Sequence, residues 1–248
     1  MFPIRDHNPS GRTPFVTYAL IALNVVIYLY SWPLEDTPRQ LAAFYSDYAL
    51  FPARIANGFH YEGLFTSMFL HGGFMHLIGN MLFLWIFGDN LEDEMGHIRF
   101  LLFYLVGGIA AGLTQVFSEP ASMVPTIGAS GAVAAVMGGY LLLYPKARVD
   151  ILLIFIIIFK AITVPAWLVL GIWFGLQFFN GITVDTSAGG VAYWAHAGGF
   201  IAGVVLTLPL WAKRGGARFW RVTDGHPPHP DAKYGFARSN VPKVRRRK

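Results

Sequence analysis

The chain contains no cysteine among its 248 residues. Disulfide bonds, thiolate catalysis and metal sites built from cysteine are therefore excluded. Charged residues are also scarce, at 13% of the chain, whereas a soluble domain carries about twice that share. With 54% hydrophobic residues and a mean hydropathy of +0.47, the composition indicates a membrane protein.

Six stretches lack Asp, Glu, Lys and Arg, and each is long enough for a spanning helix, which needs roughly 20 apolar residues. They are residues 13–34, 63–88, 100–118, 120–145, 161–184 and 186–212. The expected fold is therefore all-α, a polytopic membrane protein built as a bundle of six transmembrane helices. A seventh apolar stretch, Ile151–Phe159, is too short to span and is predicted to be an interfacial or partly buried connector. The first run is too long for a signal-peptide core, so we interpret it as the first span.

Lys and Arg concentrate in the C-terminal tail, which holds eleven of the 19, and the N-terminal tail adds Arg5 and Arg12. Six spans place both ends of the chain on the same side of the membrane. Basic residues mark the cytoplasmic side, so both termini are predicted to be cytoplasmic, in the inner (plasma) membrane of the cell. Anionic lipid explains the basic excess, and no nucleic-acid partner is expected. The expected parts are a cytoplasmic tail 1–12, a membrane domain 13–212 with an outer loop 32–62, and a basic tail 213–248. The tail is expected to be disordered, and Asp89–Arg99 is expected to be a cytoplasmic loop.

Polar groups inside a span are costly and are functional candidates by default, and four of those in the predicted spans matter most. They are His76, Asn80, Ser130 and His196. The second, fourth and sixth spans all run from outside to inside, and each of these residues lies near the outer end of its span. All four are therefore expected at a similar depth in the outer part of the bilayer.

These residue types suit nucleophilic catalysis. The Ser130 hydroxyl needs a base to take its proton, and His196 can be that base. His76 and Asn80 are four residues apart, so they share a helix face and can aim two donors at one oxyanion. The backbone N–H of Ser130, at a helix N-terminus, can supply a third. Because no Asp is expected at this depth, a Ser–His dyad is the simplest interpretation.

Each residue also has an ordinary structural interpretation. A serine in a span usually serves helix packing, a histidine often fills a core hydrogen-bonding role, and a His–Asn pair can clamp two helices. Gly199 and Gly203 fit a small-xxx-small packing seam. The fourth span presents small residues for such a seam: Gly131, Ala134, Ala135 and Gly138. The placement of all four polar residues at one depth favours catalysis.

Three motifs resemble those of the rhomboid family. Gly128-Ala-Ser-Gly131 resembles its nucleophile motif, and Ala195-His-Ala-Gly-Gly-Phe-Ile-Ala-Gly203 resembles its catalytic histidine motif. His71-Gly-Gly-Phe-Met-His76, continuing to Asn80, resembles its second-helix motif. Each motif is weak alone, but the three in this order on these spans are very specific.

The resemblance implies a six-helix rhomboid-like bundle with a water-filled cavity open to the outside. It implies a serine endopeptidase, without metal or cofactor, that cleaves single-pass transmembrane proteins in or near their spans. Ser130 would be the nucleophile and His196 the base; His76, Asn80 and the Ser130 N–H would be the oxyanion donors. Supporting roles would fall to His71, Gly128, Gly131, Gly199 and Gly203. The segment Leu91–Gly96 would be a cytoplasmic turn, and the helix around Trp173 and Gln177 would be the lateral gate for substrate.

The sequence departs from the family pattern at two places. Many members have an aromatic residue four positions after the nucleophile, which packs on the histidine, and here that position is Ala134. The group that holds His196 is therefore not identified by the motif. Many members also have a Trp-Arg pair in the first outer loop, where this chain reads Tyr61-Glu-Gly-Leu-Phe65.

Other classes of membrane protein fit less well. A metalloprotease would need His-Glu-x-x-His, and His71 and His76 are five apart with no Glu between them. An aspartyl protease would need two Asp within the membrane, and a transporter would need ionisable residues near the midplane. A rhomboid-fold binder of membrane proteins, without catalysis, is the remaining alternative. The physiological substrate and the oligomeric state stay open.

Overall fold

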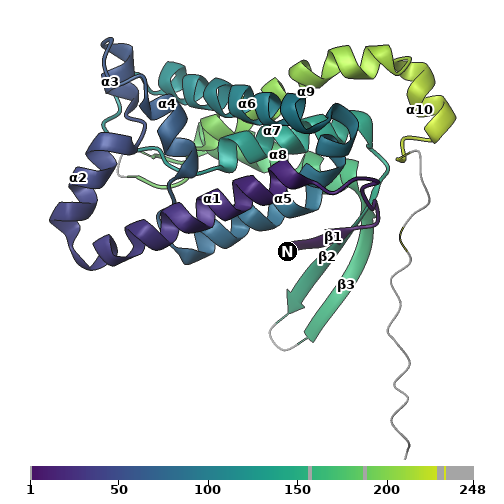
Figure 1. The fold of residues 1–248 in the computed structure, drawn as a ribbon, viewed down its shortest axis with the longest axis horizontal. Coiled ribbons are helices and arrows are strands. Elements are labelled where there is room, and N and C mark those ends of the chain that lie inside the picture. The colour runs from purple at the N-terminus through teal and green to yellow at the C-terminus, as the bar shows by residue number, and fades with distance from the viewer. Residues whose placement is uncertain (1, 156–157, 187–188, 228–231, 233–248) are drawn as a thin grey trace, which may run out of the picture.

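The computed structural model describes residues 2–155, 158–186, 189–227 and 232. The helices are α1 (Phe15–Ser31), η1 (Trp32–Asp36), α2 (Pro38–Tyr48), α3 (Pro52–Ala56), α4 (Gly63–Thr66), η2 (Ser67–Phe69), α5 (Phe74–Met95), α6 (His97–Ser118), α7 (Ser130–Leu143), α8 (Ala166–Thr183), α9 (Tyr193–Lys213) and α10 (Ala217–Thr223). The strands are β1 (Phe2–Asp6), β2 (Arg148–Phe155) and β3 (Ile158–Pro165). The long helices run roughly along one direction, with the sheet at one end of the bundle and α2 and α3 at the other (Figure 1).

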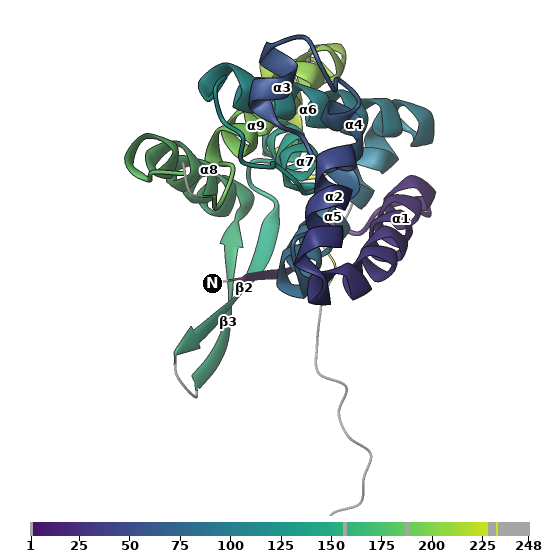
Figure 2. The same cartoon turned by 90° about the vertical axis from the view of Figure 1, so that its left-hand side faces the viewer.

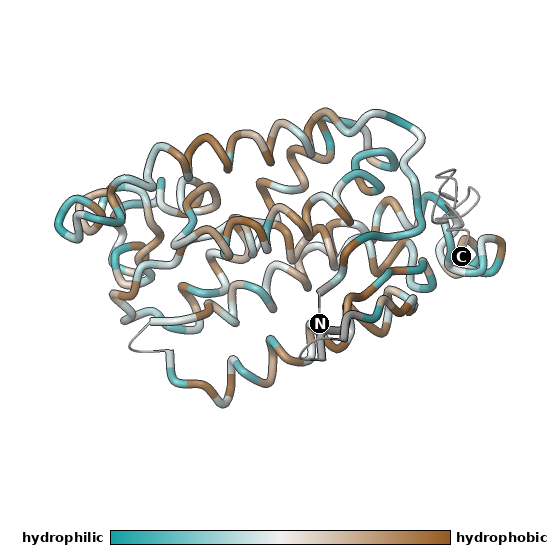
Figure 3. The backbone as a smooth tube through the Cα atoms, turned by 90° about the horizontal axis from the view of Figure 1, so that it is seen from below, coloured by the Kyte–Doolittle hydropathy of each residue, from teal (hydrophilic) through white to brown (hydrophobic). Residues whose placement is uncertain are grey.

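A polytopic helical membrane bundle is confirmed, and each of the six charge-free runs contains a helix. By length and composition, four helical segments in the described part of the chain can cross a membrane. They are Phe15–Asp36, His97–Ser118, Ala166–Thr183 and Tyr193–Lys213. A fifth consists of Gly63–Phe69 and Phe74–Met95, two helices bent by 95° at their junction. Hydrophilic residues are more frequent at the two ends of the bundle, as expected for helices embedded in lipid (Figure 3).

The run 120–145 forms a shorter helix than a sixth span requires. At 1.5 Å per residue, the 14 residues of α7 extend about 21 Å, against a hydrocarbon core of about 30 Å. The chain before α7 is irregular, and Leu50 and Thr126 exchange backbone hydrogen bonds of 3.1 and 2.8 Å within it. All ten residues 131–140 are buried, and α7 lies at the centre of the bundle (Figure 2). Ser130 is therefore carried by a central helix rather than a lipid-facing one.

The expected cytoplasmic loop Asp89–Arg99 is helical for most of its length. α5 continues through Met95, and α6 begins at His97, so Gly96 alone turns the chain, with φ of 77°. Glu92, only 1% exposed, explains the difference. Its carboxylate accepts hydrogen bonds of 2.8 Å from the backbone N–H groups of Val16 and Thr17, and so caps the N-terminus of α1. The carboxylate of Glu92 is thus buried in α5 because it accepts hydrogen bonds from the first backbone N–H groups of α1.

The stretch Ile151–Phe159, expected to be a connector, belongs to a β-hairpin. β2 pairs antiparallel with β3 and, on its other edge, with β1, giving the strand order β1-β2-β3. The hairpin projects away from the helices in Figure 1. The expected tail 1–12 is therefore structured in part, because β1 finds a partner edge in the connection between α7 and α8.

Two carboxyl groups at the sheet have opposite shifts in their pKa. Burial opposes the ionisation of Asp150, but hydrogen bonds from Thr163, His7 and Arg5 outweigh it and lower the pKa of Asp150 to about 2. Burial, reinforced by the nearby charge of Asp89, raises the pKa of Asp6 to about 8. The hydroxyl of Tyr140 donates to Asp6 at 2.9 Å, which joins β1 to the far end of α7.

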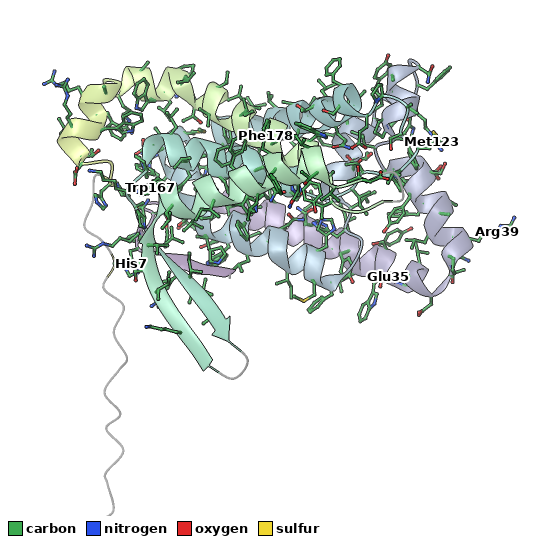
Figure 4. All side chains as sticks on the ribbon, turned by 180° about the vertical axis from the view of Figure 1, so that it is seen from behind. His7, Glu35, Arg39, Met123, Trp167 and Phe178 are labelled. Atoms are coloured by element: carbon green, nitrogen blue, oxygen red, sulfur yellow. The ribbon has the colours of Figure 1, made fainter. Side chains whose placement is uncertain are left out.

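The basic tail is helical at 217–223, where α10 forms, so the expectation of disorder fails for that segment. Residues 228–231 and 233–248 of the tail lie outside the described residues. The outer loop 32–62 contains η1, α2 and α3 rather than irregular chain. Glu35 and Arg39 of this loop lie at one end of the molecule together with Met123, and His7 and Trp167 lie at the other (Figure 4).

Candidate active site

Ser130 is the first residue of α7. The turn before it depends on Gly128, whose φ of 126° favours glycine. A Cβ at this position would lie 2.7 Å from Nε2 of His76 and 3.5 Å from Oγ of Ser130. The backbone at Gly128 therefore lies so close to the side chains of His76 and Ser130 that a residue with a Cβ would not fit there. At the start of α7 the backbone N–H groups have no partner within the helix, which makes them available to an anion.

His196, in the first turn of α9, lies beside Ser130. Its Nε2 is 2.7 Å from Oγ of Ser130, which is hydrogen-bonding distance. The two side chains are part-buried, so the pair lies below the surface but is not sealed off. A serine hydroxyl that donates to a neutral imidazole nitrogen is the arrangement a nucleophile and its general base require.

Glycines hold α9 against α7 at this point. A Cβ on Gly199 would lie 2.2 Å from the carbonyl oxygen of Gly131, and one on Gly203 would lie 1.9 Å from that of Ala135. From the other side, a Cβ on Gly138 would lie 2.1 Å from the carbonyl oxygen of Phe200. The two backbones are thus in direct contact over about two turns, and no larger residue fits without moving a helix.

His76 and Asn80 lie on α5 and face the same space as Ser130. Both line a cavity of about 980 Å³ that also contains Ser130 and His196 on its wall. Asn80 is 7% exposed, and its Nδ2 has no hydrogen-bond partner among the described residues. His71 is buried just before α5, and its ring packs edge-on against that of His76 at 5.1 Å between centroids. The residues expected around one oxyanion are thus brought together, and the ring of His71 contacts that of His76.

His196 is held by α8 rather than by α7. Ala134, which replaces the aromatic residue of the family pattern, is completely buried and small. Nδ1 of His196 instead lies 2.8 Å from Oε1 of Gln177, and the indole of Trp173 packs over the imidazole at 5.8 Å between centroids. Trp173 and Gln177 were expected at a substrate gate, and their contact with the histidine was missed.

Two glutamines near the site were not singled out as orienting residues. Gln177 holds His196, and Gln115 of α6, which is 4% exposed, accepts the backbone N–H of Ala195 at 3.2 Å. Both are polar side chains inside apolar runs, so the cost of burying a polar group in a span was the signal that could have found them. No group of three or more His, Cys, Asp or Glu in the described part of the chain could hold a metal ion.

Comparisons with known proteins agree with the motifs. The profile of the Rhomboid domain matches residues 59–213. The rhomboid-type protein YdcA of Bacillus subtilis is 33% identical over 129 residues, which cover 52% of this chain and 61% of that protein. The presenilin-associated rhomboid-like protein A of Danio rerio mitochondria is 27% identical over 191 residues, covering 75% of this chain and 45% of that protein.

A third relative covers more of its own length. Rhomboid-like protease 3 of Toxoplasma gondii is 28% identical over 210 residues, covering 79% of this chain and 72% of that protein. The chain therefore spans only about half the length of the first two relatives, and most of the length of the third.

Proposed function

Since the chain belongs to the rhomboid family, we propose that it is an intramembrane serine endopeptidase that cleaves single-pass transmembrane proteins in or near their spans. The observation that carries this proposal is the 2.7 Å approach of Ser130 Oγ to His196 Nε2 on the wall of a cavity. A relative that is named a protease and is similar over most of both chains supports it further.

The reaction begins when Ser130 attacks a peptide carbonyl and its proton passes to Nε2 of His196. The oxyanion of the tetrahedral intermediate accepts hydrogen bonds from the Ser130 N–H and from the side chains of His76 and Asn80. The imidazolium then gives its proton to the leaving amine, which breaks the C–N bond and leaves an acyl group on Ser130. Water activated by His196 hydrolyses that ester and restores the free serine.

The test is incubation of the purified protein in liposomes with a panel of single-pass substrates. Ser130→Ala and His196→Ala should each abolish cleavage, and the double variant should be no worse than either single one because the two residues act as a unit. Ser118→Ala, a serine exposed at the end of α6, is the matched control and should retain full turnover. Cleavage by Ser130→Ala well above a protein-free blank would refute the proposal. Client binding without cleavage by the wild type would point to a non-catalytic binder.

The proposed setting is the inner (plasma) membrane with both termini cytoplasmic, which places the α2 and α3 end outside. Because the chain has no cysteine, a single introduced cysteine is a unique label. Asp36→Cys should react with an impermeant maleimide added to intact cells. Arg218→Cys should react only after the membrane is permeabilised. The reverse pattern would invert the topology and put the cavity on the cytoplasmic side.

A further inference from the structure

Gln177 is a polar side chain in the middle of α8, a helix otherwise made almost entirely of apolar residues. Its Oε1 lies 2.8 Å from Nδ1 of His196, while Nε2 of the same ring lies 2.7 Å from Ser130 Oγ. The imidazole is therefore hydrogen-bonded at both nitrogens, in the line Gln177–His196–Ser130.

The chemistry of the amide decides which nitrogen carries the proton. An amide oxygen only accepts hydrogen bonds, so Nδ1 of His196 must be protonated to donate to it. In the neutral imidazole this leaves Nε2 with its lone pair directed at Ser130. That is the tautomer a general base needs. When His196 takes the serine proton, its Nδ1–H remains bonded to the amide oxygen, and the ring keeps its orientation.

A second contact fixes the plane of the ring. Trp173, one turn before Gln177 on the same face of α8, packs on His196 at 30° between ring planes and also contacts Phe200 at 6.2 Å. The hydrogen bond and the indole together restrain the imidazole from the side opposite Ser130.

The helix that supplies these contacts is loosely packed. Ala166 and Leu170, both in its first turns, are the buried residues of α8, which the structure describes in full. A Cβ on Gly171 or Gly175 would meet no atom within 4 Å. A tight helix interface therefore does not explain the position of Gln177. Its hydrogen bond to His196 does.

We propose that Gln177 is the positioning residue of His196, holding the base in its Nδ1–H tautomer and in line with Ser130. This inference rests on the proposed proteolytic function. Gln177 is not among the residues that line the cavity and acts through His196, so its effect should fall on kcat and leave KM unchanged.

The competing interpretation is that Gln177 only fills space in the bundle, and the two interpretations predict opposite rankings of variants. Gln177→Met keeps the length and shape but removes the acceptor, whereas Gln177→Glu keeps an acceptor oxygen in the same place. Positioning predicts that Gln177→Met lowers kcat by about 10-fold to 10²-fold, since a small displacement of the base is costly, and that Gln177→Glu retains more activity than Gln177→Met. Space-filling predicts that Met is tolerated and the more polar Glu is not.

The experiment measures kcat and KM for both variants in liposomes, with thermal unfolding in parallel. Leu176→Met, at a neighbouring position that is 52% exposed, is the matched control and should leave kcat unchanged. If Gln177→Met does not fold, Gln177→Asn replaces it, because its amide is withdrawn by one methylene and the same loss is expected. Activity of Gln177→Met equal to or above that of Gln177→Glu would overturn the inference.

Ser130→Ala is assayed in the same series, so that failure of the proposed proteolytic function can be distinguished from failure of the positioning role of Gln177. If Ser130→Ala is inactive and Gln177→Met is as fast as the wild type, the positioning role is wrong and the proteolytic function stands. If Ser130→Ala still cleaves, the proteolytic dyad is wrong and the positioning role falls with it.

Discussion

The hydroxyl oxygen of Ser130 lies 2.7 Å from Nε2 of His196, although 66 residues separate the two in the chain. The distance is set by backbone rather than by side-chain reach, because the Gly199 Cα faces the carbonyl of Gly131 directly. Any group added between α7 and α9 should therefore move the imidazole of His196 away from the hydroxyl of Ser130.

Gly199→Ala should reduce turnover, and Gly199→Val should reduce it more. The added Cβ would lie 2.2 Å from the Gly131 carbonyl oxygen, so the helices must separate, and a shift of about 1 Å can cost roughly 10²-fold in rate. The measurement is cleavage rate together with thermal unfolding. Gly171→Ala, where a Cβ meets nothing within 4 Å, should change neither. Normal rates in a folded Gly199→Val protein would show that this seam does not position the dyad.

His76→Ala and Asn80→Ala should each lower kcat without eliminating activity. Loss of one oxyanion donor costs about 10²–10³ in rate, and the Ser130 N–H together with the surviving side chain would remain. Thermal unfolding measured beside peptide cleavage separates a loss of folding from a loss of catalysis. If both substitutions leave kcat at the wild-type value, the pair serves only as a clamp between helices.

Glu92→Ala should destabilise the protein, even though Glu92 is far from the site in the fold. It removes the acceptor for the N–H groups of Val16 and Thr17 and for the Thr17 hydroxyl, leaving buried donors without partners. Hydrogen bonds to a charged group contribute about 1.5–3 kcal/mol each, so a fall in unfolding temperature should be readily measured in detergent. Asp36→Asn, at an exposed acidic position, is the control. An unchanged unfolding temperature would mean that α1 does not depend on this cap.

Stability should fall as pH rises from about 4 to about 8, in part because of Asp6. Its pKa is raised from 3.8 to about 8 by burial and by Asp89, so across this range the folded state binds a proton that the unfolded state has lost. Asp6→Asn cannot ionise and still offers an oxygen to Tyr140, so its unfolding temperature should depend less on pH. The check is a series of thermal unfolding curves between pH 5 and pH 9. Identical slopes for the wild type and the variant would contradict the assignment.

The sequence predicted the features of the fold and of the candidate site that depend on where charged and polar residues lie. Each of the six runs without charge contains a helix, although α7 in the run 120–145 is shorter than a span requires. The cost of a polar group in lipid singled out Ser130 and His196, which the structure places in contact. It missed the length of α5 because the reason for burying Glu92 is the N-terminus of α1, a partner 75 residues away. Charge alone marked that carboxylate as a loop residue.

Gln177 illustrates a second limit. The cost of burying a polar group, which drew attention to His76, applies equally to a glutamine in an apolar helix. Which nitrogen of His196 the glutamine contacts depends on how α8 is rotated against α9. The start of α7 is a similar case: the run 120–145 has no charge, yet its first part is not helical, and Thr126 in it pairs with Leu50. Contacts between segments far apart in the sequence determine both features, and the hydropathy of a segment does not show which partner it will contact.

The sheet also sets an order in which the segments of the chain can pair during synthesis. Arg5 of β1 binds Asp150 of β2, 145 residues later, and β2 needs β3 beyond it. A ribosome that adds about 5–20 residues per second leaves β1 without its partner strand for roughly 7 to 30 s. During that time α1, α5, α6 and α7 are all made and can insert. β1 precedes α1 in the chain, yet it is among the last elements to find its place, because it pairs with β2 only after α7 has been made.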